Sequence, residues 1–145
     1  MRTMSDQVIS QEEIAAVFPT VAKTIADALG IEPEDVKLDV SLIEGLDAES
    51  IDFLDMVFRL ERAFKVKIPR GKIIEDVRGD MPEEEFEQKG VLTEKGLAQL
   101  RRYLSEIPDS RFKPTMKVGE IARLYTPETF CKLVIRAQRA ASAAA

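Results

Sequence analysis

The sequence predicts an all-α protein, and three observations support this fold class. Apolar residues recur at the three- and four-residue spacing of amphipathic helices along most of the chain. Residues 10–13 read Ser-Gln-Glu-Glu, the S-x-x-E form of a capping box that begins a helix. Proline and glycine residues fall where helices are expected to begin or end, and nothing in the pattern requires a sheet.

The first helix is expected to follow the capping box that begins at Ser10. Pro19 interrupts its pattern, because proline lacks a backbone N–H and biases Phe18 toward an extended conformation. Two arrangements remain open: a short helix ending near Phe18 with a second starting at Pro19, or a single kinked helix. Gly30 is the expected stop. The apolar residues at helical spacing are Ile14, Val17, Phe18, Val21, Ile25, Ala28 and Leu29.

A long loop and a second helix are expected next. Residues 31–49 show no sustained period, and loops of this length in a compact domain are often functional. The helix is expected over residues 50–64. Its predicted apolar side consists of Phe53, Leu54, Val57, Leu60 and Phe64, and its polar stripe of Asp52, Asp55, Arg59 and Arg62.

The remaining elements are also expected to be helical. Residues 70–113 suggest a short helix near 72–78, an acidic PEEEFEQKG piece, and a helix over 93–105. Another short helix is expected over residues 118–125. A final one starts at Thr126, with Pro127 suited to its first position. The inner residues of these helices are predicted to be Leu97, Leu100 and Leu104, then Val118, Ile121 and Leu124.

Length and composition narrow the possible functions. The 145 residues suffice for one compact domain, and the net charge of −5 argues against a nucleic-acid binder. No apolar run approaches the roughly 20 residues of a membrane span, and no secretory signal is visible. The single cysteine, Cys131, excludes an intrachain disulfide, favours a cytoplasmic setting and is expected to be a small buried hydrophobe.

The absence of histidine excludes several kinds of chemistry. A Ser-His or Cys-His nucleophile pair is impossible, and so is a zinc site of the usual Cys/His type. Catalysis by a pair of carboxylates remains formally open, but no such pair lies in an obvious cleft-forming context. Residues 34–61 hold nine acidic and two basic residues, a local net of −7. This segment is either a solvated acidic face or a surface that steers basic partners.

Ser50 is the residue on which the functional interpretation depends. It stands at the head of the second helix, where a serine hydroxyl commonly accepts a bond from a free backbone N–H and caps the helix. A serine at this place could also carry a phosphate ester, because a helix N-terminus favours an attached anion. The local sequence leaves both interpretations open.

The wider sequence around Ser50 resembles the acyl carrier proteins. ADALGIEPEDVKLDVSLIEGLDAESIDFLDMVFRLERAFKVKIP follows the family's order: a helix ending in L-G, an acidic loop, then D-S-L opening a helix that ends in F-x-x-x-I-P. KVGEIARLY, residues 117–125, is similar to the family's third-helix segment. Three positions depart from the family: Glu49 replaces Asp, Ile51 replaces Leu, and Asp47 stands in place of Gly, with Gly45 two residues earlier.

The resemblance implies a four-helix bundle with an inserted helical segment and an extended C-terminal helix. Residues 1–145 would be a single carrier domain, with the inserted subdomain at about 70–115. A dedicated transferase would attach 4′-phosphopantetheine to Ser50 through a phosphodiester. Acyl groups would then be carried as thioesters in fatty-acid, lipid or polyketide-type synthesis. The run SIDFLDMVF with KIP after it is also similar to specialised carriers of unusually long acyl chains.

A carrier of this kind is not an enzyme. Its expected partners are the transferase and the enzymes that transfer, elongate or modify acyl chains, and the chain is expected to be a monomer. The residues expected to dock partners are Glu49, Asp52, Asp55, Arg59 and Arg62. The two arginines have an alternative explanation as helix stabilisers, since base near a helix C-terminus suits the macrodipole. The inserted segment is either functional or a packing embellishment.

The alternative function is an unmodified helical interaction module that kept the bundle but lost the arm. The serine and its acidic neighbours separate the two hypotheses. A chain without the arm would have no reason to keep Ser50 with Glu49 and Asp52 around it.

Overall fold

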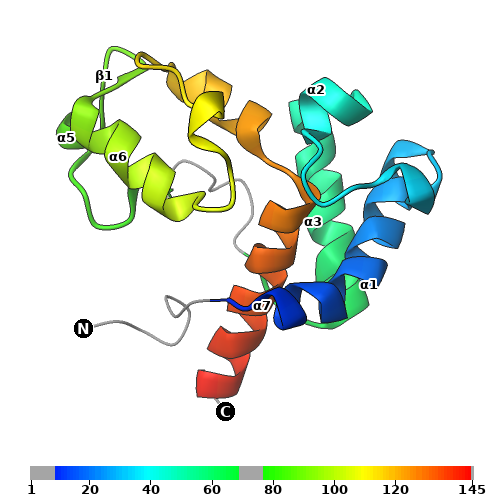
Figure 1. Cartoon of the computed structure of the whole chain (residues 1–145). Helices are drawn as coiled ribbons and strands as arrows, with labels where there is room; N and C mark the ends of the chain where they lie inside the picture. Colours follow the sequence, from blue (N-terminus) through cyan, green and yellow to red (C-terminus); the bar gives the residue numbers. More distant parts are fainter. Residues whose placement is uncertain (1–8, 69–76, 145) are drawn as a thin grey trace. The chain divides into compact units, whose positions relative to one another are not determined.

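The computed structural model describes residues 9–68 and 77–144, and the chain divides into two compact units. The first, called the bundle unit below, comprises Met1–Arg70 and Tyr125–Ala145. The second, called the inserted unit, comprises Gly71–Leu124. Helices dominate both, so the all-α fold class is confirmed (Figure 1). The helix expected near 72–78 lies outside the described residues, except for residues 77 and 78, which are helical.

Helix α1 spans Gln11–Leu29 without a break. The predicted capping box is present: the Glu13 N–H donates to the Ser10 hydroxyl at 3.1 Å, and the Ser10 N–H donates to the Glu13 carboxylate, also at 3.1 Å. Pro19 lies inside the helix, which decides for one helix over two. Gly30 ends the helix with a φ of 70°, a left-handed conformation that glycine adopts without strain.

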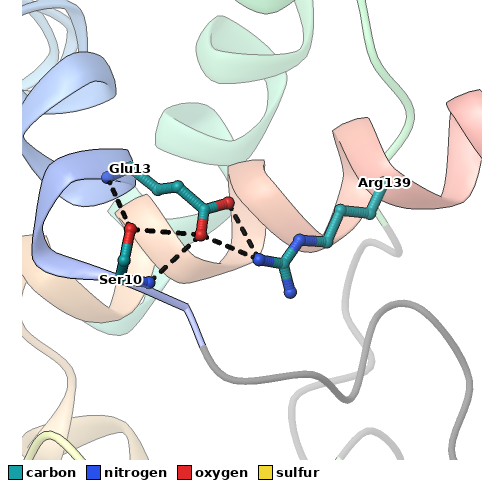
Figure 2. Close-up of polar contacts among 3 residues, drawn as sticks. All are labelled: Ser10, Glu13 and Arg139. Carbon is teal, nitrogen blue, oxygen red and sulfur yellow. Dashed lines mark hydrogen bonds and ion pairs between the residues drawn. The ribbon is translucent and has the colours of Figure 1, made fainter.

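Helix α7, Pro127–Ala144, begins as predicted. The hydroxyl of Thr126 accepts from the N–H of Thr129 at 3.3 Å and so caps the first turn. Farther along, Arg139 donates to both carboxylate oxygens of Glu13, at 2.9 and 2.8 Å (Figure 2). The pKa of Glu13 is lowered, first by the bond from the backbone N–H of Ser10 and then by Arg139. This carboxylate therefore serves both as a helix cap and as a link from α1 to α7.

Residues 31–49 are not the continuous loop that the sequence predicted. They contain a short 3₁₀ helix, η2, at Pro33–Asp35 and an α-helix, α2, at Leu42–Leu46. The hydroxyl of Ser41 caps α2 by accepting from the N–H of Glu44 at 3.1 Å. Because α2 has only five residues, too few for two turns, its apolar residues show no period that sequence reasoning could detect.

Helix α3 spans Ser50–Phe64, with the bounds that the sequence predicted. The predicted buried face was wrong at two positions: it included Leu54, which is 45% exposed, and omitted Met56, which is fully buried. Phe64 is half-buried. A helix turns by about 100° per residue, so a side chain between two stripes can fall on either face. The side chains of α3 that form the core are Phe53, Met56, Val57 and Leu60.

The core of the bundle unit lies between α1, α3 and α7, and Figure 1 shows α1 running beside the other two. Three aromatic rings meet there: the ring centroid of Phe53 is 5.9 Å from that of Tyr125 and 5.6 Å from that of Phe130. Cys131, the residue after Phe130, is also fully buried, as expected. Its desolvation raises the pKa of the thiol to about 12.

The inserted unit contains α5 at Glu83–Phe86, β1 at Glu87–Gln88, β2 at Val91–Leu92 and α6 at Glu94–Tyr103, then η3 at Asp109–Arg111 and η4 at Val118–Leu124. The two strands form a short antiparallel hairpin, which the sequence pattern did not predict. Lys89 and Gly90 make its two-residue turn with φ values of 55° and 81°. Positive φ at both turn residues suits the twist of a hairpin.

Helix α6 packs against α5 and β2 inside this unit. A Cβ added to Gly96 would lie 2.0 Å from the carbonyl oxygen of Phe86, so glycine permits the close approach of α6 and α5. Leu100 and Leu104 are fully buried, as predicted, and Leu97 is half-buried. Thr93, predicted as the first helical residue, is instead the N-cap.

Residues 118–124 form the 3₁₀ helix η4 and cluster with the inserted unit. The N–H of Val118 donates to the carbonyl oxygen of Gly90 at 2.9 Å, and that of Leu92 donates to Met116 at 2.8 Å. Ile121 and Leu124 are buried, as predicted. The segment that resembles the family's third helix is therefore hydrogen-bonded to the β-hairpin, and the inserted unit extends to Leu124.

Candidate functional site

The short helix α2 precedes the start of α3 and is fixed at both ends. The N–H of Leu42 donates to the carbonyl oxygen of Tyr125 at 3.1 Å, which ties the start of α2 to the segment before α7. Gly45 lies against the loop, since an added Cβ would be 2.4 Å from the Cγ2 atom of Val40. Gly45 therefore lets α2 pack closely on its own loop.

Three residues connect α2 to α3. Asp47 ends α2 with a φ of 60°, the left-handed conformation. Aspartate is among the few residues other than glycine that enter this region readily. Asp47 thus adopts a backbone conformation that glycine favours. It stands at the position where the acyl carrier proteins, which this sequence resembles, have glycine. Ala48, which is 3% exposed, follows and donates its N–H to the carbonyl oxygen of Leu42 at 2.9 Å.

Glu49, not Ser50, occupies the N-cap position of α3. The N–H of Glu49 donates to the carboxylate of Asp52 at 2.8 Å, which is the reciprocal bond of a capping box. Ser50 is the first residue of the helix proper. The interpretation of Ser50 as the N-cap residue is therefore wrong, because the neighbouring residue fills that position.

The surroundings of Ser50 suit an attached phosphodiester. The first backbone N–H groups of a helix have no intrahelical acceptor and lie at the positive end of its dipole, so they stabilise a nearby anion. Glu49 and Ile51 on either side are exposed. An open cleft of about 700 Å³ also reaches the start of α3, lined on its polar side by Asp35, Asp47 and Asp52. These carboxylates make the surface near the start of α3 acidic.

The polar stripe of α3 contains one ion pair and one separate cation. The Nε atom of Arg59 lies 2.9 Å from the carboxylate of Asp55, and both side chains remain partly exposed. Arg62 is exposed in the last turn. The structure thus brings Glu49 to Asp52 and Asp55 to Arg59, and it leaves Arg62 apart from these two contacts.

A second, apolar stripe, which the sequence pattern did not predict, runs along the exposed side of α3. Ile51 is 73% exposed, Leu54 45% and Phe58 39%, and the three residues are spaced three and four apart. Large apolar side chains gathered at the surface commonly mark an interaction site. Their helical spacing is visible in the sequence, but the prediction that Leu54 is buried hides the stripe.

Comparison with known proteins assigns the family. The sequence model described as "Phosphopantetheine attachment site" matches residues 19–77. The acyl carrier protein of Campylobacter curvus is 41% identical over 54 residues, which cover 37% of this chain and 70% of that protein. The acyl carrier protein AcpXL of Brucella melitensis is 34% identical over 74 residues, covering 50% of this chain and 80% of that protein. AcpXL of Rhizobium meliloti is 35% identical over a stretch of the same length.

The chain belongs to the acyl carrier protein family. The prosthetic group of this family is 4′-phosphopantetheine, and its members carry groups rather than catalyse reactions. Within residues 9–68 and 77–144, no group of three or more Asp, Glu, Cys or His side chains is placed to hold a metal ion. In the same ranges, no helix is both long and apolar enough to cross a membrane.

Proposed function

We propose that this chain carries acyl groups as thioesters on a 4′-phosphopantetheine arm attached to Ser50. The observation that carries the proposal is the position of Ser50. It is the first residue of α3, it lies between exposed neighbours, and it falls inside the matched attachment-site sequence. Glu49 and Asp52 form the capping contact of α3, so the helix can begin without a serine at the N-cap position.

The attachment reaction is a group transfer from coenzyme A. The hydroxyl oxygen of Ser50 forms a bond to the phosphorus that bears the pantetheine, and the bond from that phosphorus to the nucleotide breaks. The nucleotide leaves with the electron pair, and the serine proton passes to solvent. The product is a phosphodiester anion at the N-terminus of α3, where the helix dipole stabilises it.

Cys131 makes an unusually clear experiment possible. It is the only cysteine of the chain, it is fully buried, and burial raises its thiol pKa to about 12. A thiol of that kind reacts slowly, because the thiolate is the reactive form. An Ellman titration of the folded chain should therefore detect almost no thiol before modification and one thiol per chain after it.

The test incubates the chain with a broad-specificity phosphopantetheinyl transferase, coenzyme A and Mg²⁺. Intact mass should rise by one phosphopantetheine, and one titratable thiol should appear in the native protein. Ser50→Ala should abolish both signals. Ser41→Ala is the matched control. Ser41 caps α2 nearby and is not the proposed site, so this variant should still gain the phosphopantetheine mass and the thiol. Modification of the Ser50→Ala chain would disprove the assignment.

We further propose that Glu49, Asp52, Asp55, Arg59 and Arg62 contact partner enzymes. The exposed apolar stripe of Ile51, Leu54 and Phe58 lies on the same helix as these charges. An interface that combines apolar anchors with surrounding charges gives both affinity and orientation. Arg59→Glu with Arg62→Glu should leave the fold intact and reduce acyl transfer with the native partner enzymes. Unchanged kinetics would leave the two arginines as helix stabilisers.

The apolar stripe also favours the second candidate function, an interaction module without an arm. Intact-mass measurement of the protein purified from its native host separates the two. A chain that carries the added phosphopantetheine supports the carrier. A chain that is unmodified there and resists the transferase in vitro supports the module. As parts of the carrier proposal, we expect a cytoplasmic monomer whose single domain is interrupted by the inserted subdomain.

A further inference from the structure

An open groove of about 590 Å³ lies between α1 and α3. Its α1 side carries Lys23 and Asp27, and its α3 side carries Arg59 and Arg62. Small residues, Pro19, Thr20, Thr24 and Ala63, complete the lining and leave the space between the helices open. The groove thus collects three cations and one carboxylate from helices that are about thirty residues apart in the chain.

This local charge is opposite to that of the surrounding unit. Met1–Arg70 and Tyr125–Ala145 together hold fifteen acidic and eleven basic residues, a net of −4. The acid is concentrated before and at the start of α3, whereas the groove faces the later turns of that helix. The bundle unit therefore has an acidic surface at one end of α3 and a basic groove at the other.

Two of the three cations have no hydrogen-bond or ion-pair partner in the described part of the chain. Arg59 pairs with Asp55 on its own helix. Lys23 and Arg62 are exposed and make no hydrogen bond or ion pair with any residue in 9–68 or 77–144. The Thr24 hydroxyl in the groove already donates to the carbonyl oxygen of Thr20 at 2.7 Å. The groups here without a partner among the described residues are thus two cations, Lys23 and Arg62, and one carboxylate, Asp27, so the excess charge is positive.

We propose that this groove is a docking site for a carboxylate-rich segment of a partner protein, with Lys23 as a recognition residue beside Arg59 and Arg62. The identity of the partner as an acyl-handling enzyme rests on the carrier function proposed above. The charge of the groove does not depend on the arm. Lys23 could not be assigned from the sequence, because only the packing of α1 on α3 brings it beside the two arginines.

Charge and shape both favour a protein segment as the occupant. Arginine binds carboxylates through paired charge-assisted hydrogen bonds, and lysine adds a point charge. An anionic membrane spreads its charge over a wide surface, so it would also meet the acid that is concentrated at the start of α3. It is also flat, whereas the groove is concave and has the carboxylate of Asp27 on its wall. A protruding acidic segment can enter such a groove, whereas a flat surface cannot.

The first experiment titrates hexaglutamate into the ¹⁵N-labelled full chain at low ionic strength. Chemical-shift changes should concentrate on the backbone amides of Lys23, Arg59 and Arg62. Lys23→Glu with Arg62→Glu should weaken binding about tenfold or more, because it replaces two attractive charges by repulsive ones. Lys37→Glu is the matched control: it makes the same kind of charge change at an exposed loop lysine and should alter the affinity less than about twofold.

Several outcomes would overturn the proposal. Shift changes spread evenly over Lys37, Lys65 and the groove would show general attraction to cations. Equal weakening by Lys37→Glu would show the same. Shift changes at the groove with phosphatidylglycerol vesicles but not with hexaglutamate would assign it to a lipid surface. A thermal melt of each variant checks that the fold survives, and Lys23→Gln provides a milder second variant.

The failure of this inference can be told apart from the failure of the carrier function. Hexaglutamate binding uses the unmodified chain and needs no arm. The transferase reaction on the wild-type chain is measured separately by mass. Normal modification of Ser50 with no hexaglutamate response would reject the docking site and keep the proposed carrier function. Shift changes at the groove without modification of Ser50 would reject the carrier function and keep the basic docking site.

Discussion

The bundle unit and the inserted unit reach buried cores by different means. The bundle unit uses three helices of fifteen or more residues, whose apolar stripes are long enough to be recognised in sequence. The inserted unit uses a ten-residue helix and much shorter elements, joined by backbone bonds such as that from Thr93 to Phe86. A long amphipathic helix contributes many buried residues for each chain reversal, whereas short elements depend on tight turns and close approaches.

The comparison teaches where each unit is sensitive to mutation. In the bundle unit, most of the stabilisation comes from apolar side chains such as Leu60, which is fully buried. The inserted unit also has fully buried side chains, such as Leu100. In addition, it has a position, Gly96, at which the backbone of α6 lies against the backbone of Phe86. Burial of one large apolar side chain stabilises a fold by about 1.5–3 kcal/mol, so both kinds of position are measurable.

The largest expected effects come from truncating one buried leucine in each unit. Leu60→Ala and Leu100→Ala should each lower the free energy of unfolding by about 2–5 kcal/mol, because each leaves a cavity. The chain has two tyrosines, Tyr103 in the inserted unit and Tyr125 in the bundle unit. Replacing one or the other by Phe leaves a fluorescent probe of a single unit.

With these probes, Leu60→Ala should lower the urea midpoint that Tyr125 reports more than the one that Tyr103 reports. Leu100→Ala should do the reverse. Identical midpoints for both probes in every variant would show that the two units unfold as one. The stability of each unit could then not be measured separately.

The next effect compares two glycines whose added methyl group would meet different atoms. At Gly96 the new Cβ would lie 2.0 Å from the carbonyl oxygen of Phe86, which belongs to the backbone and cannot rotate away. At Gly45 it would lie 2.4 Å from a methyl group of Val40, and a side chain can shift. Gly96→Ala should therefore cost about 3 kcal/mol or more and Gly45→Ala nearer 1 kcal/mol, measured by urea unfolding.

Gly45→Ala has a second readout, because α2 precedes Ser50, the proposed attachment site. A shift of α2 should slow the transferase reaction at Ser50, whereas Gly96→Ala should slow it less. Equal stability losses at the two glycines would mean that the backbone of the inserted unit yields as easily as a side chain.

The same contrast explains what the sequence could predict. The limits of α3 and the capping box at Ser10 were predictable, because a long apolar stripe and a capping motif are local signals. The hairpin turn at Lys89 and Gly90 was not recognised, since its strands have two residues each and show no period. The approach of Gly96 to Phe86 is a tertiary contact, and no local pattern encodes it.

The candidate site was predictable to the same degree. Ser50 and its charged neighbours followed from the resemblance and lie on one helix, as expected. The N-cap lies one residue before Ser50, at Glu49, whose N–H donates to the carboxylate of Asp52. Lys23 was missed because its position beside Arg62 depends on how α1 packs against α3.

A smaller effect is expected from the capping contact at the start of α3. Asp52→Ala removes the acceptor for the Glu49 N–H and should lower stability by about 1 kcal/mol. Thr93→Ala, at the N-cap of α6, is the counterpart in the inserted unit, because its hydroxyl accepts from the Gly96 N–H at 3.0 Å. Urea unfolding with the two tyrosine probes should show each loss in its own unit. A loss from Asp52→Ala below about 0.3 kcal/mol would mean that water satisfies the exposed Glu49 N–H equally well.

The smallest expected effect is a pH dependence with a different origin in each unit. The pKa of Glu13 is lowered mainly by the backbone N–H of Ser10, with Arg139 second. The pKa of Glu120 is lowered mainly by Lys113, with the backbone N–H of Lys117 second. A lowered folded-state pKa means that the unfolded chain binds protons more readily, so this stabilisation is present above the ordinary pKa of 4.5. It is lost as the pH falls from there through the folded-state value.

Salt should distinguish the two carboxylates. A surface ion pair is screened at high ionic strength, whereas a bond from a backbone N–H is less sensitive. The pH-dependent loss reported by Tyr103 should therefore shrink in 1 M NaCl more than the loss reported by Tyr125. Glu13→Gln and Glu120→Gln should each flatten the dependence of their own unit below pH 4.5. Arg139→Gln should retain part of the Tyr125 dependence, because the Ser10 bond remains (Figure 2). A complete loss in that variant would make the arginine, rather than the helix cap, the group that holds the Glu13 pKa down.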